Sequence, residues 1–197
     1  IKSKNLYDDG LSAYRKIITQ RLDAYRLNHS ECVSECAATL AEQYGADVEK
    51  ARLAGLLHDV MKNDGVESHL DEIEKAGITL SLTELANRKV WHQISGAAFL
   101  KNENIVTDEE ILGAVRWHTT GRANMTLLEK VVYIADFISA DRDYPDVGVV
   151  RKLAQQSLED AILYTTQYTI KKLVSAGLPV HPATVDCYND MILRKGN

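Results

Sequence analysis

The chain has 197 residues, of which 45% are hydrophobic, and this is enough to bury the core of one domain. Its formal net charge of -5 argues against a surface that binds nucleic acid or anionic lipid over its whole extent, although it leaves room for a local cationic pocket. No stretch is long and apolar enough to span a bilayer, and the N-terminal sequence IKSKNLYDDG lacks the apolar core of a signal peptide, so we expect a cytoplasmic protein.

Helical periodicity runs along almost the whole chain. Apolar residues recur at helical spacing and no segment alternates as a strand does, which predicts an all-α fold. A first helix should present Leu11, Ile18 and Tyr25 on one side and end near Asn28. We expect residues 1–25, which contain most of this helix, to pack on a single helical domain.

The next two helices carry histidines on their inward faces. One should place His29 inward and stop at Gly45, a residue suited to the C-terminal cap of a helix. The following helix can begin after an Asp47 cap and run to about Met61. A row of small residues on it leads to His58 and allows a neighbouring helix to come close.

Capping signals locate the later helices. A Ser or Thr followed three residues on by Glu predicts three helix starts, which are Ser81 with Glu84, Thr107 with Glu110, and Thr126 with Glu129. A long amphipathic helix is expected at roughly residues 158–175 and a final helix from Pro182. The three cysteines form neither a disulfide framework nor a zinc pattern and are expected to be small buried hydrophobes.

Six residues of metal-ligand type fall on the inward faces of five predicted helices. They are His29, His58, Asp59, His92, His118 and Asp136. Each alone has a structural explanation, since one backbone carbonyl can satisfy an inward histidine. Together they favour a buried metal, because a cation relieves the cost of burying both aspartates, and imidazole with carboxylate suits iron, manganese, cobalt or zinc.

The order of these residues resembles the HD-domain superfamily of metal-dependent phosphohydrolases, in its form with additional histidines. Longer motifs are similar to the YqeK family within it, which comprises symmetrical dinucleoside-tetraphosphate hydrolases. These motifs are RLNHS, AGLLHDVMK, HTTGR, LLEKVVYIADFI, DRDYP and GLPVHPATV, and the similarity extends from Arg26 to the end of the chain. Where family members commonly have Leu-His-Gly around the third histidine, this chain has VWHQISG, so the motif supports His92 least among the ligands.

The resemblance implies an HD-domain bundle over residues 26–197 with a di-metal site. It assigns His29, His58, Asp59 and Asp136 to one metal, and His92 and His118 to a second, with Asp59 bridging. The metals would be two divalent or transition ions, iron first, with manganese or cobalt as alternatives. A metal-bound hydroxide would then split diadenosine tetraphosphate into two ADP, with Asp59 as a catalytic residue.

A tetraphosphate also needs positive charge from the protein. Lys62 and Arg122 are the first candidates for catalysis and substrate binding, followed by Arg26 and Arg142 for substrate binding; all four could instead be ordinary solvated side chains. The loop after His118 adds three candidate substrate contacts, which are Thr119, Thr120 and Gly121. The threonines can donate hydrogen bonds to a phosphate. The glycine can let the backbone approach a phosphate, or it can simply end the helix.

Three other interpretations of these residues remain open. The ligands fix the reaction class better than the substrate, so the chain could be a phosphohydrolase for another nucleotide. It could also be a metal-containing nucleotide-binding sensor without turnover, or, if it binds no metal, a helical scaffold. In each enzymatic or sensor case the expected partner is a small nucleotide, with no nucleic acid and no membrane, and the sequence leaves a homodimer open.

Overall fold

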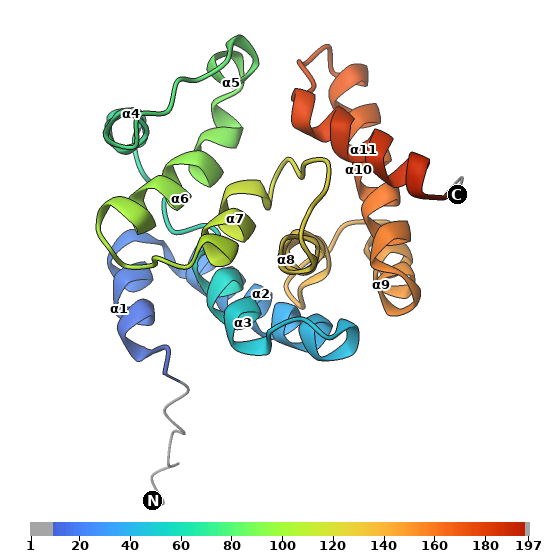
Figure 1. Cartoon of the computed structure of the whole chain (residues 1–197), viewed down its shortest axis with the longest axis horizontal. Helices are drawn as coiled ribbons and strands as arrows, with labels where there is room; N and C mark the ends of the chain where they lie inside the picture. Colours follow the sequence, from blue (N-terminus) through green and yellow to red (C-terminus); the bar gives the residue numbers. More distant parts are fainter. Residues whose placement is uncertain (1–9, 196–197) are drawn as a thin grey trace, which may run out of the picture.

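The computed structural model describes residues 10–195, and within them every regular element is a helix, which confirms the all-α prediction. Residues 1–9, at the start of the predicted N-terminal unit, lie outside the described part. The helices, shown in Figure 1, are α1 Ser12–Arg21, α2 Ala24–Tyr44, α3 Val48–Leu57, α4 Val66–Lys75, α5 Leu82–Ala86, a 3-10 helix η1 Arg88–Val90, α6 Trp91–Asn102, α7 Glu109–Trp117, α8 Leu127–Ile138, α9 Val147–Gln156, α10 Leu158–Ser175 and α11 Pro182–Lys195.

Helix α8 occupies the middle of the molecule. It is seen end-on in Figure 1 and contacts α2, α3, α7, α9 and α10. The run from Val131 to Ala135 is completely buried, because this part of α8 is apolar on every side and has neighbours all around it. Asp136 directly follows that run, so the burial of α8 carries this carboxylate into the interior.

Helices α2 and α3 pack with their backbones unusually close together. A Cβ atom placed on Gly55 of α3 would lie 2.9 Å from the Cα atom of Ser34 on α2. The predicted row of small residues is therefore the contact surface between these helices, and Ala51, Ala54 and Gly55 are all completely buried or nearly so. This contact brings the N-terminal half of α2 to the end of α3.

Caps fix most of the predicted helix starts. Ser81 with Glu84 and Thr126 with Glu129 form complete capping boxes, as expected. The prediction for Thr107 is wrong, because the carboxylate of the next residue, Asp108, accepts from the backbone N–H groups of Glu110 and Ile111 and so takes the N-cap position.

Two helix ends differ from the prediction. The first helix ends at Arg21 rather than near Asn28, because Asp23 caps a new helix by accepting from the N–H of Arg26. Helix α3 ends at Leu57 rather than near Met61, so the ligand-type residues that follow it lie in a turn. Helix α9 was not predicted at all, whereas the long helix and the final helix appear at their expected positions.

Helix α1 packs on the rest of the molecule through α3 and its own buried Ile18. The guanidinium of Arg21 lies 4.2 Å from the centre of the Phe99 ring and forms a 2.6 Å ion pair with Asp64. The division between residues 1–25 and 26–197 stays a prediction. Among the helices of residues 10–195, none combines the length and the apolarity needed to cross a bilayer.

Candidate metal centre

The six ligand-type residues predicted from the sequence meet in one place. Three groups of three among them have ligand atoms within 4.8 Å of one another. The groups are His29–His58–Asp59, His58–His118–Asp136 and Asp59–His92–His118. Their residues come from α2, the turn after α3, the first turn of α6, the end of α7, and α8. All four histidines are at most 3% exposed.

Asp59 stands between two sets of imidazoles. Its Oδ1 atom lies 3.3 Å from Nε2 of His92 and 3.5 Å from Nε2 of His118. Its Oδ2 atom lies 3.6 Å from Nε2 of His58. The two carboxylate oxygens therefore face different groups of ligands, which is the geometry that a bridging carboxylate needs.

Hydrogen bonds on the far side of each ring orient three of the histidines. The Nδ1 atoms of His58 and His118 each lie 2.7 Å from a backbone carbonyl oxygen, that of Gly55 and of Val115 respectively. A carbonyl only accepts, so each Nδ1 must carry its proton, and in the neutral ring Nε2 then has a free lone pair. Nδ1 of His29 lies 2.8 Å from Oδ2 of Asp141. Such contacts commonly orient metal-binding histidines.

Two buried atoms at the centre lack hydrogen-bond partners. They are Nε2 of His58 and Oδ1 of Asp59, and each leaves an acceptor unsatisfied in the interior. An unsatisfied buried polar group costs roughly 1–3 kcal/mol. The donor set of imidazole and carboxylate, with its free acceptors aimed at one point, fits a divalent metal.

Burial and neighbouring charges set the ionisation of the centre. Burial lowers the pKa of His58 to about 4, which keeps this ring neutral and available as a ligand. Burial would raise the pKa of Asp59, but the rings of His58 and His118 and the ammonium group of Lys62 hold it well below its usual range. His58 and Asp59 are therefore in the protonation states that metal binding requires.

Three of the predicted cationic residues reach the centre. Nη1 of Arg26 lies 3.0 Å from Oδ2 of Asp59. Nζ of Lys62 lies 2.9 Å from Nε2 of His92 and 3.5 Å from Oδ1 of Asp59. The guanidinium of Arg142 is hydrogen-bonded to the side chain and the backbone carbonyl of Asp136. A phosphate chain lying over the centre would therefore meet positive charge from three segments.

Arg122 has a partner elsewhere. Its guanidinium makes two hydrogen bonds of 2.9 and 3.0 Å with the carboxylate of Glu129, the residue that completes the capping box of α8. These contacts give Arg122 a structural role at the start of α8. Its predicted contact with substrate stays a prediction.

The loop after His118 is only partly available to a ligand. The hydroxyl of Thr119 lies 3.1 Å from Nε2 of His92, at the edge of the centre. The hydroxyl of Thr120 is buried, accepts from the side-chain amide of Gln93 and donates to the carbonyl of Gly121. Gly121 has a φ of +64°, and a Cβ atom there would lie 2.9 Å from Sγ of Cys187 in α11, so packing against α11 requires this glycine.

Sequence reasoning missed two residues that support the centre. Asp141 was noted only within DRDYP, yet it binds His29 and accepts from the hydroxyl of Ser139. The side-chain oxygen of Gln93, next to His92, accepts from the backbone N–H groups of Thr119 and Thr120 and so fixes the loop. For Asp141, the one available signal was its position in the sequence shortly after Asp136.

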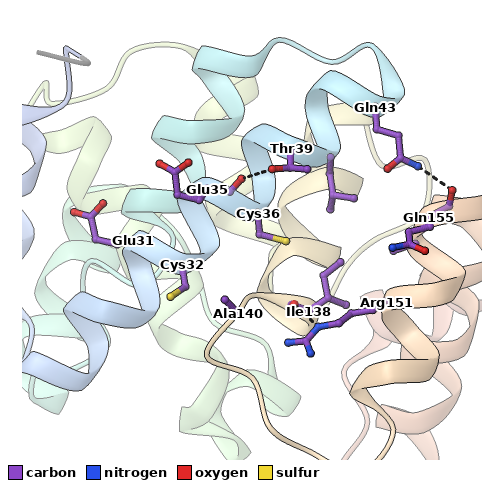
Figure 2. Close-up of a pocket in the computed structure, with 12 residues that line it drawn as sticks. Glu31, Cys32, Glu35, Cys36, Thr39, Gln43, Ile138, Ala140, Arg151 and Gln155 are labelled. Carbon is purple, nitrogen blue, oxygen red and sulfur yellow. Dashed lines mark hydrogen bonds between the residues drawn. The ribbon is translucent and has the colours of Figure 1, made fainter. Parts of the chain in front are cut away.

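The remaining histidines and cysteines lie outside the centre. His69 is only 8% exposed, and its Nδ1 atom lies 2.7 Å from the hydroxyl oxygen of Ser95. Cys187 is buried, whereas Cys32 and Cys36 are only half-buried and line a cavity of about 810 Å³ between α2 and α9 (Figure 2). No candidate metal group within residues 10–195 includes a cysteine.

Comparison with known proteins identifies the family. An HD-domain model matches residues 26–141. The chain belongs to the HD-domain family. It is also 38% identical to the symmetrical bis(5'-nucleosyl)-tetraphosphatase of Bacillus subtilis (strain 168), covering 89% of this chain and 94% of that protein. The protein of the same name from Staphylococcus aureus is 34% identical over 89% of this chain and 91% of its own length. These matches confirm the resemblance to the YqeK family.

The fold of this HD-domain protein has a close counterpart among solved structures. The crystal structure of a chain from Clostridium acetobutylicum, described as a predicted HD superfamily hydrolase involved in NAD metabolism, superimposes with a TM-score of 0.89. The two chains are 35% identical, and the match covers 92% of this chain and 96% of that one. The HD-domain bundle predicted from the sequence is thereby confirmed.

Proposed function

We propose that this HD-domain protein is a metal-dependent hydrolase that splits diadenosine tetraphosphate symmetrically into two ADP. Similarity along nearly the whole chain to symmetrical bis(5'-nucleosyl)-tetraphosphatases supports the substrate. The observation that carries the chemistry is the placement of Asp59 between two sets of buried imidazoles. This placement favours two metal ions, for which we propose iron, with manganese or cobalt as alternatives.

The six ligand-type residues would hold the metals, with Asp59 shared between them. When bound, such ions supply Lewis acidity and lower the pKa of a coordinated water. In the reaction, water adds to an inner phosphorus and the bond from that phosphorus to the central bridging oxygen breaks. The oxygen leaves with the other half as ADP, and the two hydrogens of the water are released as protons when both ADP products are fully ionised.

The cations of this chain would hold the phosphates during that step. Arg26 and Lys62 approach the centre from the side of Asp59, and Arg142 approaches it from the side of Asp136. Fixed positive groups placed there stabilise charge that develops on the phosphoryl oxygens and orient the tetraphosphate. The departing ADP is stable as an anion, so the site has little need for a strong general acid.

Incubation of the metal-loaded protein with diadenosine tetraphosphate, followed by separation of the products, tests this proposal. ADP as the sole nucleotide product is expected. AMP with ATP would instead show asymmetric cleavage, and binding without any product would favour a nucleotide sensor. Elemental analysis should find more than one equivalent of a transition metal, and a metal-free active protein would contradict the metal assignment.

Another nucleotide as the main substrate is the second candidate, because the metal ligands alone do not select a base. Parallel assays with other nucleotides under the same conditions separate the two. The cytoplasmic location, the homodimer and the lack of nucleic-acid binding stay predictions.

A further inference from the structure

A cavity of about 750 Å³ lies between α5 with η1 on one side and α10 with α11 on the other, and we call it the α5–α10 cavity. In Figure 1 these segments form two arms on the same side of the molecule, α5 in green and α10 with α11 in orange and red. Its volume falls within the range of about 300–1,000 Å³ that small-molecule sites usually have. The apolar side chains of its wall include Leu85, Val90, Phe137, Leu173 and Leu178.

A buried carboxylate connects the two arms. Oε1 of Glu84 in α5 lies 3.3 Å from Nη2 of Arg116 in α7 and 3.3 Å from Nε2 of His181, just before α11. Glu84 is only 7% exposed and also completes the capping box with Ser81. The arms are therefore held in position by contacts outside the apolar wall, which leaves that wall available to a ligand.

The α5–α10 cavity approaches the metal centre at Thr119. Thr119 is part of its wall, and the hydroxyl of Thr119 lies 3.1 Å from Nε2 of His92. A second hollow of about 240 Å³ includes Asp136 and Arg142 in its wall. The two hollows have three wall residues in common, Phe137, Tyr168 and Lys172. The two hollows therefore adjoin at these residues, between the ligand-type residue Asp136 and α10.

Tyr168 offers an aromatic surface at the junction. Its side chain is on the surface, and 38% of the residue is exposed. Its ring stacks with that of Tyr144 at 6.4 Å between centroids, and Nζ of Lys172 lies 5.9 Å from its centroid. An accessible ring beside a cation is suited to a stacked base followed by a phosphate.

Positive charge without a carboxylate partner surrounds the cavity. Arg88, Lys89 and Lys172 belong to its wall, and within the described residues none of them forms an ion pair. Many other surface cations of this acidic chain are paired, as Lys101 is with Glu109. Unpaired cations around an apolar wall indicate a ligand that is apolar at one end and anionic at the other.

We infer that the α5–α10 cavity binds one nucleoside of the substrate, with its base against Tyr168 and the apolar wall and its phosphates directed past Lys172 to the metal centre. The inference rests on the proposed function and adds to it the residues that recognise the nucleoside.

Calorimetric titration of the metal-loaded protein with ADP tests the inference through matched variants. Leu85→Glu places a charge in the apolar wall and is paired with Leu82→Glu, which alters an exposed residue of the same helix outside the cavity. Lys172→Gln is paired with Lys171→Gln, the neighbouring exposed lysine of α10 that does not line the cavity. Tyr168→Ala removes the stacking surface.

We expect the dissociation constant of ADP to rise at least about tenfold in Leu85→Glu and Tyr168→Ala and about fivefold in Lys172→Gln, with both controls within about twofold of the parent. Pyrophosphate, which has no base, should bind Tyr168→Ala as well as it binds the parent protein. The content of bound transition metal, measured by elemental analysis, should be the same in Tyr168→Ala as in the parent, which separates a lost base contact from a damaged metal centre.

Two results tell the inference and the proposed function apart. If the parent protein forms ADP from diadenosine tetraphosphate but the cavity variants bind ADP as the controls do, the inference is overturned and the function stands. If the parent forms no ADP while the cavity variants weaken ADP binding as expected, the cavity assignment is supported and the proposed reaction is wrong.

Discussion

Gly55→Ala tests the contact between α2 and α3 that brings the metal ligands together. The added methyl group would lie 2.9 Å from Cα of Ser34 and 3.0 Å from both N of Ser34 and O of Val33. All three are backbone atoms, so no side chain can turn aside and the helices must move apart. Overpacking of this kind costs about 1–3 kcal/mol, against a gain of about 0.4–1 kcal/mol from replacing a helical glycine.

We therefore expect a net loss of about 1–2 kcal/mol in the free energy of unfolding. For a chain of 197 residues this corresponds to a melting temperature lower by roughly 2–8 °C. Thermal unfolding followed by circular dichroism measures it. The bound-metal content should fall as well, because His58 donates to the carbonyl of Gly55 and His29 lies on the helix that is displaced.

Gly148→Ala is the matched control for this measurement. Gly148 lies in the first turn of α9, and a Cβ atom there would meet nothing within 4 Å. The same chemical change should leave metal content unaltered and raise stability by up to about 1 kcal/mol. If Gly55→Ala raised the melting temperature as Gly148→Ala does, the close approach of α2 and α3 would be wrong.

Three further substitutions test individual contacts of the centre. Asp59→Ala should abolish hydrolysis of diadenosine tetraphosphate while the helical circular dichroism signal persists, and full activity would refute its shared position between the metals. Asp141→Ala should weaken metal binding about 10–100-fold in a chelator competition, since it removes the acceptor for Nδ1 of His29; unchanged affinity would show that this contact does not matter. Arg122→Gln should lower stability by about 1–2 kcal/mol by unpairing Glu129 and leave KM unchanged, whereas a raised KM in a stable variant would show that Arg122 contacts substrate.

Sequence patterns predicted the parts of this fold that local interactions decide. The long helix α10 and the start of α11 at Pro182 follow from apolar spacing and a proline suited to the first turn. Where two local signals competed, prediction failed. Asp108 displaced Thr107 as a cap, and Asp23 divided what the apolar spacing alone presented as one helix.

The candidate ligands could be found because burying charge is expensive. An imidazole or carboxylate on an apolar helix face requires a partner, and six such residues together indicated a common one. Their supporting contacts could not be found in this way. Whether Asp141 reaches His29 depends on how the chain turns after α8, and the α5–α10 cavity depends on the positions of arms about a hundred residues apart.

Helices α3 and α7 both end with a hydrogen bond from a histidine side chain to a backbone carbonyl. The last turn of any helix leaves carbonyl oxygens without a partner in the helix. Here His58 and His118 each follow the final helical residue and donate through Nδ1 to the carbonyl three residues earlier. At each helix end, one hydrogen bond thus satisfies one of these carbonyl oxygens, fixes the ring tautomer and directs Nε2 into the interior. Because this geometry depends only on residues within one turn, both imidazoles are oriented for metal binding by the helices themselves before any ion is bound.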